Sequence, residues 1–140
     1  MKKILIFGIL LCLFSCEKKE VSKEDLPYLN GYWEISEVSF PDGTKKNYTV
    51  NPTIDFIHLE NNHGFRKKMQ PKFDGSYKTS KKQESFKVVE AQQTFILRYE
   101  NNLSEWEEKL IRLDSTSFAV QNNEGVLYAY KRFHPIVIPK

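Results

Sequence analysis

From residue 30 onward, apolar residues recur in short segments that turn-forming residues separate. The first segment holds Trp33, Ile35, Val38 and Phe40 and ends at Pro41-Asp42-Gly43, a sequence that favours a turn. The complete set of such segments is residues 31–40, 53–60, 64–70, 73–79, 84–91, 94–100, 104–113, 116–121 and 126–133. This pattern predicts an all-β domain of about eight or nine strands.

Strands at this regular, close spacing are typical of a β-sandwich or a β-barrel with antiparallel neighbours. Closure into a barrel removes the exposed strand edges that would otherwise invite aggregation. The hairpin turns have suitable residues, since Asn61 and Asn62 can adopt positive φ angles, and Gln92 and Gln93 separate a pair of strand-like segments.

One segment also fits a helix. Ser104 is followed three residues later by Glu107, which is the pattern of a capping box. The alternation of Ile111 with Leu113, and then of Phe118 with Val120, continues past this point with the period of a strand. We therefore predict a strand over residues 104–113.

The first sixteen residues have the layout of a secretory signal. Lys2 and Lys3 precede an uncharged apolar run over residues 4–14, which is too short to span a bilayer as a helix. The run ends in Leu-Phe-Ser-Cys at residues 13–16, and this sequence resembles the lipobox of bacterial lipoproteins. The resemblance implies that a signal peptide over residues 1–15 is removed and that Cys16 is lipidated.

The predicted lipid anchor determines where the protein works. We expect the chain to be attached to a membrane of the cell envelope, the outer membrane of a Gram-negative bacterium, on its periplasmic or surface face. Residues 16–29 carry many charges, so we expect a flexible tether there. Cys12 would leave with the signal and Cys16 would carry lipid, so no disulfide can form within the domain.

Removal of the signal also changes the net charge. The full chain has 21 basic and 18 acidic residues, and the loss of Lys2 and Lys3 leaves 19 basic residues, a net charge near +1. A general nucleic-acid binder needs a clear excess of positive charge. The composition therefore argues against nucleic acid as a partner.

Both ends of the domain resemble the lipocalins. Gly31, Tyr32 and Trp33 match the Gly-x-Trp element that opens a lipocalin barrel, and Arg132 matches the basic residue that closes it. Residues 106–118 are similar to the penultimate hairpin of lipocalin-like domains in bacterial lipoproteins. The resemblance implies an antiparallel up-and-down β-barrel of about eight strands over residues 30–134, a tail over 135–140, and Arg132 lying over the Trp33 ring.

Aromatic side chains are the first candidates for a binding site. The mature chain has 17 of them, the 19 of the full sequence less Phe7 and Phe14, and several alternate at strand spacing. They could fill the barrel as a core, or line a cleft for a small apolar or amphipathic ligand. The candidates for ligand contact are Phe95, Tyr99, Trp106, Tyr128 and Tyr130.

A basic segment supports an alternative function. Residues 66–82 contain seven basic side chains and one acidic one, Asp74. As a patch around Arg66, Lys67, Lys68 and Lys72, the segment could bind an anionic glycan or an acidic protein partner, although outward lysines on a strand also form an ordinary solvated surface.

Sequence patterns typical of catalytic sites are weak in this chain. His58 and His63 flank a predicted turn, but no third ligand at matching spacing joins them. No serine or carboxylate lies in a pattern that indicates a particular type of reaction. We expect neither an enzyme nor a bound metal or cofactor.

Overall fold

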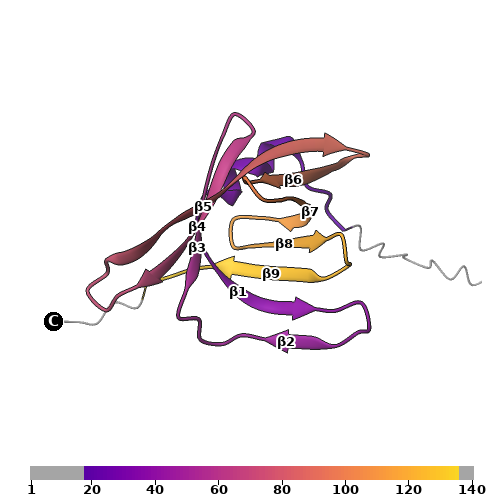
Figure 1. Cartoon of the computed structure of the whole chain (residues 1–140). Coiled ribbons are helices and arrows are strands. Elements are labelled where there is room, and N and C mark those ends of the chain that lie inside the picture. The colour runs from indigo at the N-terminus through magenta and orange to yellow at the C-terminus, as the bar shows by residue number, and fades with distance from the viewer. Residues whose placement is uncertain (1–17, 136–140) are drawn as a thin grey trace, which may run out of the picture.

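The computed structural model describes residues 18–135, which form a closed β-barrel preceded by one short helix (Figure 1). The 3-10 helix η1 spans Lys23–Leu29. The strands are β1 Gly31–Ser39, β2 Lys45–Asn47, β3 Ile54–Glu60, β4 His63–Pro71, β5 Tyr77–Ala91, β6 Thr94–Glu100, β7 Glu105–Leu113, β8 Ser117–Asn122 and β9 Leu127–Arg132. The signal peptide, Cys16 and most of the expected tail lie outside the described residues.

Every strand pairing is antiparallel, and the order of neighbours is β2-β1-β3-β4-β5-β6-β7-β8-β9. A further pairing joins β1 to β9 and closes eight strands into a barrel, with β2 as an additional strand beside the end of β1. The predicted up-and-down barrel of about eight strands is confirmed, and the sandwich is excluded.

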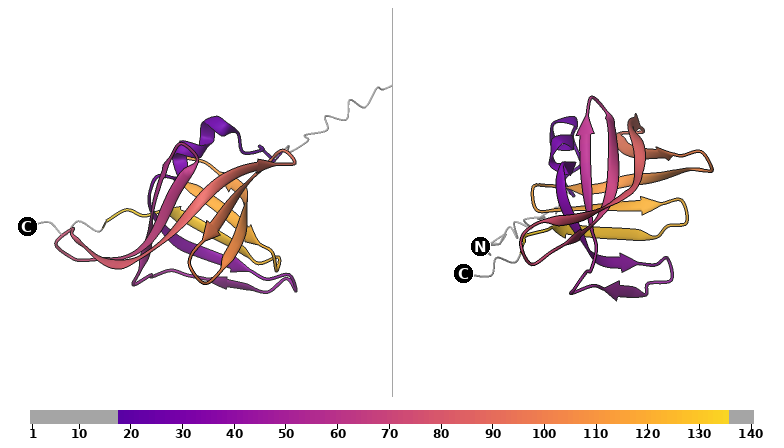
Figure 2. Two further views of the ribbon diagram at one scale, coloured as in Figure 1. Left: turned by 45° about the horizontal axis from the view of Figure 1, so that its top comes forward. Right: turned by 60° about the vertical axis from the view of Figure 1, so that its left-hand side comes forward.

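Two strands differ from the sequence prediction. The end of segment 73–79 and all of segment 84–91 belong to one long strand, β5, whereas residues 73–76 lie in the turn that precedes it. Figure 2 shows the β4–β5 hairpin reaching beyond the barrel at one side. The polar residues between the two segments are mostly exposed, so they continue the strand without an apolar alternation. Strand β2 was not predicted, because its three residues are all polar and exposed.

The expected tether is wrong over its second half. Lys23–Leu29 folds as η1, with Leu26 and Leu29 buried in the barrel core. Asp25 fixes the start of this helix, because its Oδ2 accepts hydrogen bonds from both Ser22 N and Ser22 Oγ. Two leucines within a charged run thus pack this segment against the barrel core.

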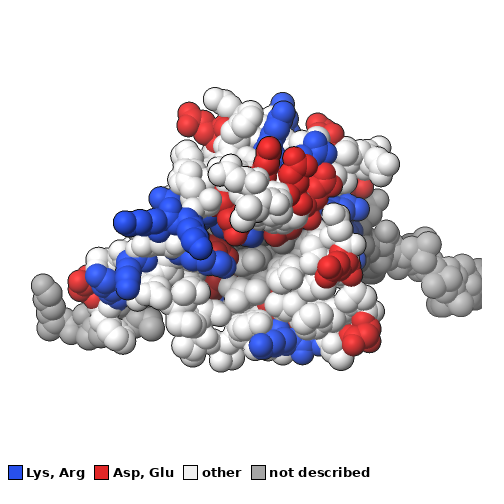
Figure 3. Space-filling model, in the orientation of Figure 1, with Lys and Arg blue, Asp and Glu red and all other residues white. Residues whose placement is uncertain are grey.

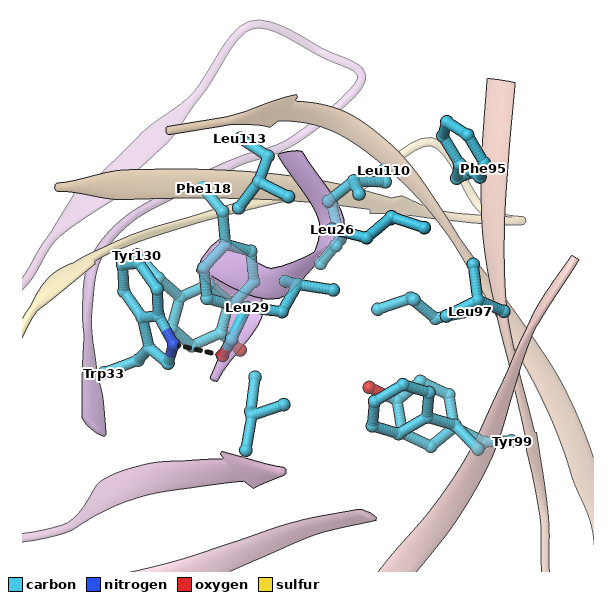
Figure 4. Close-up of a cluster of buried hydrophobic side chains, with 14 residues drawn as sticks. Leu26, Leu29, Trp33, Phe95, Leu97, Tyr99, Leu110, Leu113, Phe118 and Tyr130 are labelled. Atoms are coloured by element: carbon cyan, nitrogen blue, oxygen red, sulfur yellow. Dashed lines mark hydrogen bonds between the residues drawn. The ribbon is translucent and has the colours of Figure 1, made fainter. Parts of the chain in front are cut away.

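The core is concentrated at the end of the barrel that η1 covers (Figure 4). Trp33 is completely buried, and Phe118 contacts it edge-on with ring centroids 4.7 Å apart. Tyr130 in turn stacks on Phe118, with ring centroids 4.6 Å apart and ring planes nearly parallel. The described residues contain no helix that is long and apolar enough to cross a membrane.

Candidate ligand site at the open end of the barrel

Arg132 closes one end of the barrel. Its guanidinium carbon lies 3.7 Å from the centroid of the Trp33 ring system, within range for cation–π attraction. The same side chain donates hydrogen bonds to the carbonyl oxygens of Tyr28, Asn30 and Ser115, at 2.9, 2.7 and 3.1 Å. Arg132 therefore joins η1, the start of β1 and the β7–β8 turn.

Gly31 makes room for this arrangement. It has a φ angle of +122°, and a Cβ at this position would lie 2.5 Å from Arg132 Nη1. A residue with a side chain would be strained in this conformation and would also collide with the guanidinium. The structure thus brings together all three residues, Gly31, Trp33 and Arg132, that the sequence suggested for barrel closure.

The opposite end of the barrel is open and contains a cavity of about 510 Å³. Because neighbouring strands are antiparallel, this end gathers the start of β7, the β8–β9 turn and the start of β9. The residues that line the cavity are Arg66, Lys68, Trp106, Glu107, Glu108, Asn122, Asn123, Glu124, Tyr128 and Tyr130. We call this cavity the mouth.

Arg66 is the central charged group of the mouth. It lies on β4 at an inward-facing position, and its side chain is only 14 % exposed. Its Nε and Nη2 both donate to Glu84 Oε2, at 3.0 and 2.7 Å, and its Nη1 lies 3.5 Å from Glu108 Oε1. The guanidinium also lies over the Tyr99 ring, 4.8 Å from its centroid.

Two further carboxylates face the same interior. Asp55 is 2 % exposed and Glu108 is 8 % exposed. Lys68 Nζ lies 2.6 Å from Asp55 Oδ1, although the geometry is that of an ion pair and not of a hydrogen bond. Glu108 Oε2 has no hydrogen-bond partner among the described residues.

The buried position of Glu108 affects its titration. Burial raises the pKa of Glu108 above its ordinary value, Arg66 opposes this change, and the negative charge of Glu84 adds to it. Burial likewise raises the pKa of Tyr99 and of Tyr130, so both phenols keep their protons at neutral pH. The mouth therefore contains a carboxyl group that keeps its proton to a higher pH than an exposed glutamate does.

The five aromatic candidates separate into three groups. Trp106, Tyr128 and Tyr130 line the mouth. Tyr99 is buried directly beside Trp106, with the two ring planes within 2° of parallel and their centroids 5.1 Å apart. Phe95 is a core residue, 6 % exposed and opposite Leu110 in the β6–β7 register, and it does not line the mouth.

The basic candidates do not form one patch. Arg66 and Lys68 line the mouth, whereas Lys67 pairs with Phe56 in the register of β3 and β4 and lies over the outer Phe65 ring. Lys72 lies in the turn after β4, beside a second cavity of about 370 Å³ formed with residues 133–135. Figure 3 shows basic and acidic side chains gathered in separate areas of one face. Binding of a partner by the outward lysines stays a prediction.

Sequence reasoning missed Asp55, Glu84 and Glu108. A signal for Glu108 was present: Trp106, Glu108 and Leu110 alternate along β7, which places all three side chains on the inner face. The described residues contain no group of three or more His, Cys, Asp or Glu side chains placed to hold a metal ion.

Comparison with known proteins gives structural similarities only. No protein-family model matches the sequence, and no curated protein matches it. A lipocalin-like protein from Bacteroides uniformis is 13 % identical with a TM-score of 0.48, and the alignment covers 76 % of this chain and 99 % of that one. Apocrustacyanin C1 is 10 % identical with a TM-score of 0.49, covering 82 % and 67 %. Lobster apocrustacyanin A1 is 12 % identical with a TM-score of 0.45, covering 81 % and 67 %.

Because these TM-scores lie below 0.5, the class of the fold rests on the barrel itself. Eight antiparallel strands in simple order close through β1 and β9. A short helix precedes the barrel, and an arginine of the last strand covers a tryptophan of the first. The domain is a lipocalin-like β-barrel.

Proposed function

We propose that this protein is a non-catalytic binding protein, attached by lipid at Cys16 to the cell envelope, that holds a small amphipathic molecule in the mouth of its barrel. The observation that carries the proposal is the mouth itself. Its volume of about 510 Å³ lies within the range of small-molecule sites, and it combines aromatic side chains with a few convergent charged groups.

The packing of the interior limits the size of the ligand. Leu97, Val88 and Tyr99 are buried in the barrel core below the mouth. A long acyl chain would have to displace these side chains to enter the barrel along its axis, and interiors packed to this degree resist such insertion. A compact molecule with one apolar face and one polar group suits the mouth better.

A binding experiment tests this proposal. We expect the neutral fluorophore N-phenyl-1-naphthylamine to bind the full-length protein held in phosphatidylcholine nanodiscs, with empty nanodiscs as the reference. Trp106→Ala and Tyr128→Ala should each weaken binding by about tenfold, since each removes a ring that lines the mouth.

A matched control distinguishes the two cavities. Phe73→Ala removes an exposed ring beside the second cavity and should leave binding unchanged. If all three variants bind the probe as the wild type does, the mouth is not the binding site. The lipid anchor has its own test: labelled palmitate should be incorporated by wild-type cells and not after Cys16→Ala.

A further inference from the structure

The positive charges of the mouth are already engaged by protein groups. Arg66 donates to Glu84 from two nitrogens, faces Glu108 with the third, and lies over the Tyr99 ring. Lys68 forms an ion pair with Asp55. Among the described residues, an arriving carboxylate would find no cation in the mouth that lacks a carboxylate partner, and it would compete with the partners already there.

Such competition would be unfavourable. If Lys68 left Asp55, it would leave a carboxylate whose side chain is 3 % exposed without its ion-pair partner, and a charge buried in this way is costly. If Glu84 or Glu108 left Arg66, the guanidinium would exchange one carboxylate for another, with no gain in charge pairing. The mouth therefore offers little to an anion.

The negative charges, in contrast, are in excess. Asp55, Glu84 and Glu108 surround Arg66 and Lys68, so three carboxylates face two cations. Glu124 adds another carboxylate at the exposed β8–β9 turn, where it lines the cavity. Glu107 also lines the cavity, but its carboxylate accepts a hydrogen bond from Arg98 at 2.8 Å.

One of these carboxylates has hydrogen-bonding capacity to spare. Glu108 is more than nine-tenths buried, lines the mouth, and has one oxygen with no partner among the described residues. A buried acceptor of this kind is stabilised by an N–H or O–H donor. Trp106 and Tyr128 also line the mouth, and aromatic rings of this kind attract ammonium groups.

Resting on the proposed function, we propose that the mouth selects a small ligand bearing a protonated amine, with the ammonium directed at Glu108 and Glu124 and the apolar part against Trp106 and Tyr128. A carboxylate of the same size and shape binds more weakly because of the acidic surroundings. The binding site thus prefers amines to carboxylates.

Three probes that differ in one group test the proposal: 2-phenylethylamine, 2-phenylethanol and 3-phenylpropionate. Each is titrated calorimetrically at pH 8 into the full-length protein in phosphatidylcholine nanodiscs, and the signal from empty nanodiscs is subtracted. We expect the amine to bind at least about tenfold more tightly than the carboxylate, with the alcohol between them.

Charge-neutralising variants then assign the selectivity to residues. Glu108→Gln and Glu124→Gln should each weaken binding of the amine by about three- to tenfold and change binding of the alcohol by less than about twofold. Glu124 is exposed, so its variant tests the idea even if Glu108→Gln disturbs folding. Glu90→Gln, an exposed position near the end of β5 that does not line the mouth, is the matched control and should change neither.

The outcomes separate the two proposals. If 3-phenylpropionate binds as tightly as the amine, or if both glutamine variants retain the full preference for the amine, the selectivity is disproved while the binding function stands. If none of the three probes binds the wild type more tightly than it binds Trp106→Ala, the function and the selectivity fail together.

Discussion

Arg132 covers the indole of Trp33, and the two residues are also opposite each other in the register of β9 and β1. The side-chain contact therefore lies directly over the strand pairing that closes the barrel. Trp33 Nε1 also donates a hydrogen bond to the carbonyl oxygen of Leu29 at 2.8 Å. Closure of the barrel and docking of η1 consequently depend on the same pair.

Replacement of Arg132 should weaken the closed end. Arg132→Ala removes one cation–π contact and three hydrogen bonds to carbonyl oxygens, so we expect a loss of about 2–4 kcal/mol in the free energy of unfolding, measured with urea. Arg132→Lys should recover less than half of the lost free energy of unfolding, because an ammonium cannot reproduce the planar set of N–H donors of a guanidinium. An alanine variant within about 0.5 kcal/mol of the wild type would contradict this role.

Gly31→Ala should also destabilise the protein, by about 1–3 kcal/mol, because of the φ angle of +122° and the collision with Arg132 Nη1. The collision disappears when the guanidinium is absent. In a double-mutant cycle, Gly31→Ala should therefore cost less in the Arg132→Ala background than in the wild type. Strictly additive effects would show that backbone strain alone explains the requirement for glycine.

The sequence predicted the barrel better than the mouth. Alternating apolar residues identified most strands, and the positive φ angles of Asn61 and Asn62 confirm the tight turn expected between β3 and β4. Gln92 and Gln93 form a second such turn between β5 and β6. These features are local, so a single sequence reveals them.

The mouth depends on contacts that are distant in sequence. Glu84 and Glu108 approach Arg66 because three strands meet in the closed barrel, and no local pattern shows such a meeting. The charge of Arg66 suggested an outer surface, whereas its position on β4 directs it inward. Leu29 was misassigned for a related reason, since the core that buries it is formed by strands far along the chain.

Leu29 provides a direct test of the docked helix. Its side chain is completely buried, so Leu29→Ala should lower the free energy of unfolding by about 2–5 kcal/mol, the range for large-to-small changes in a core. Tyr28→Ala is the matched control, because Tyr28 is 44 % exposed and should contribute little. If both variants unfold at the wild-type urea concentration, η1 does not stabilise the barrel.

Glu108 should give the stability a specific dependence on pH. Its pKa is raised in the folded state, so above the ordinary value of 4.5 the folded protein retains a proton that the unfolded chain has lost. The stability that this proton contributes is present below pH 4.5 and is lost as the pH rises through the raised pKa. The advantage of wild type over Glu108→Gln should therefore shrink as the pH rises.

Urea unfolding of both proteins between about pH 4 and pH 8 measures this difference. Asp25, Glu37, Asp42, Asp74 and Asp114 have lowered pKa values and produce the opposite trend, but they are common to both proteins and cancel. Arg66, Glu84 and Asp55 are the charged groups that act on Glu108, and they too are unchanged. If the difference in free energy of unfolding between the two proteins does not change with pH, the pKa of Glu108 is at its ordinary value.

Finally, the ion pairs of Arg66 with Glu84 and Glu108 should contribute more to ligand selectivity than to the stability of the barrel. Arg66→Met leaves Glu84 and the buried Glu108 without their guanidinium, so we expect a loss of about 3–5 kcal/mol in the free energy of unfolding. Arg66→Met combined with Glu108→Leu replaces the buried pair by apolar side chains, and we expect the double variant to regain most of that loss. It should nevertheless lose the preference for 2-phenylethylamine, because the carboxylate at the centre of the mouth is gone. A double variant no more stable than Arg66→Met would show instead that the barrel needs this ion pair in order to fold.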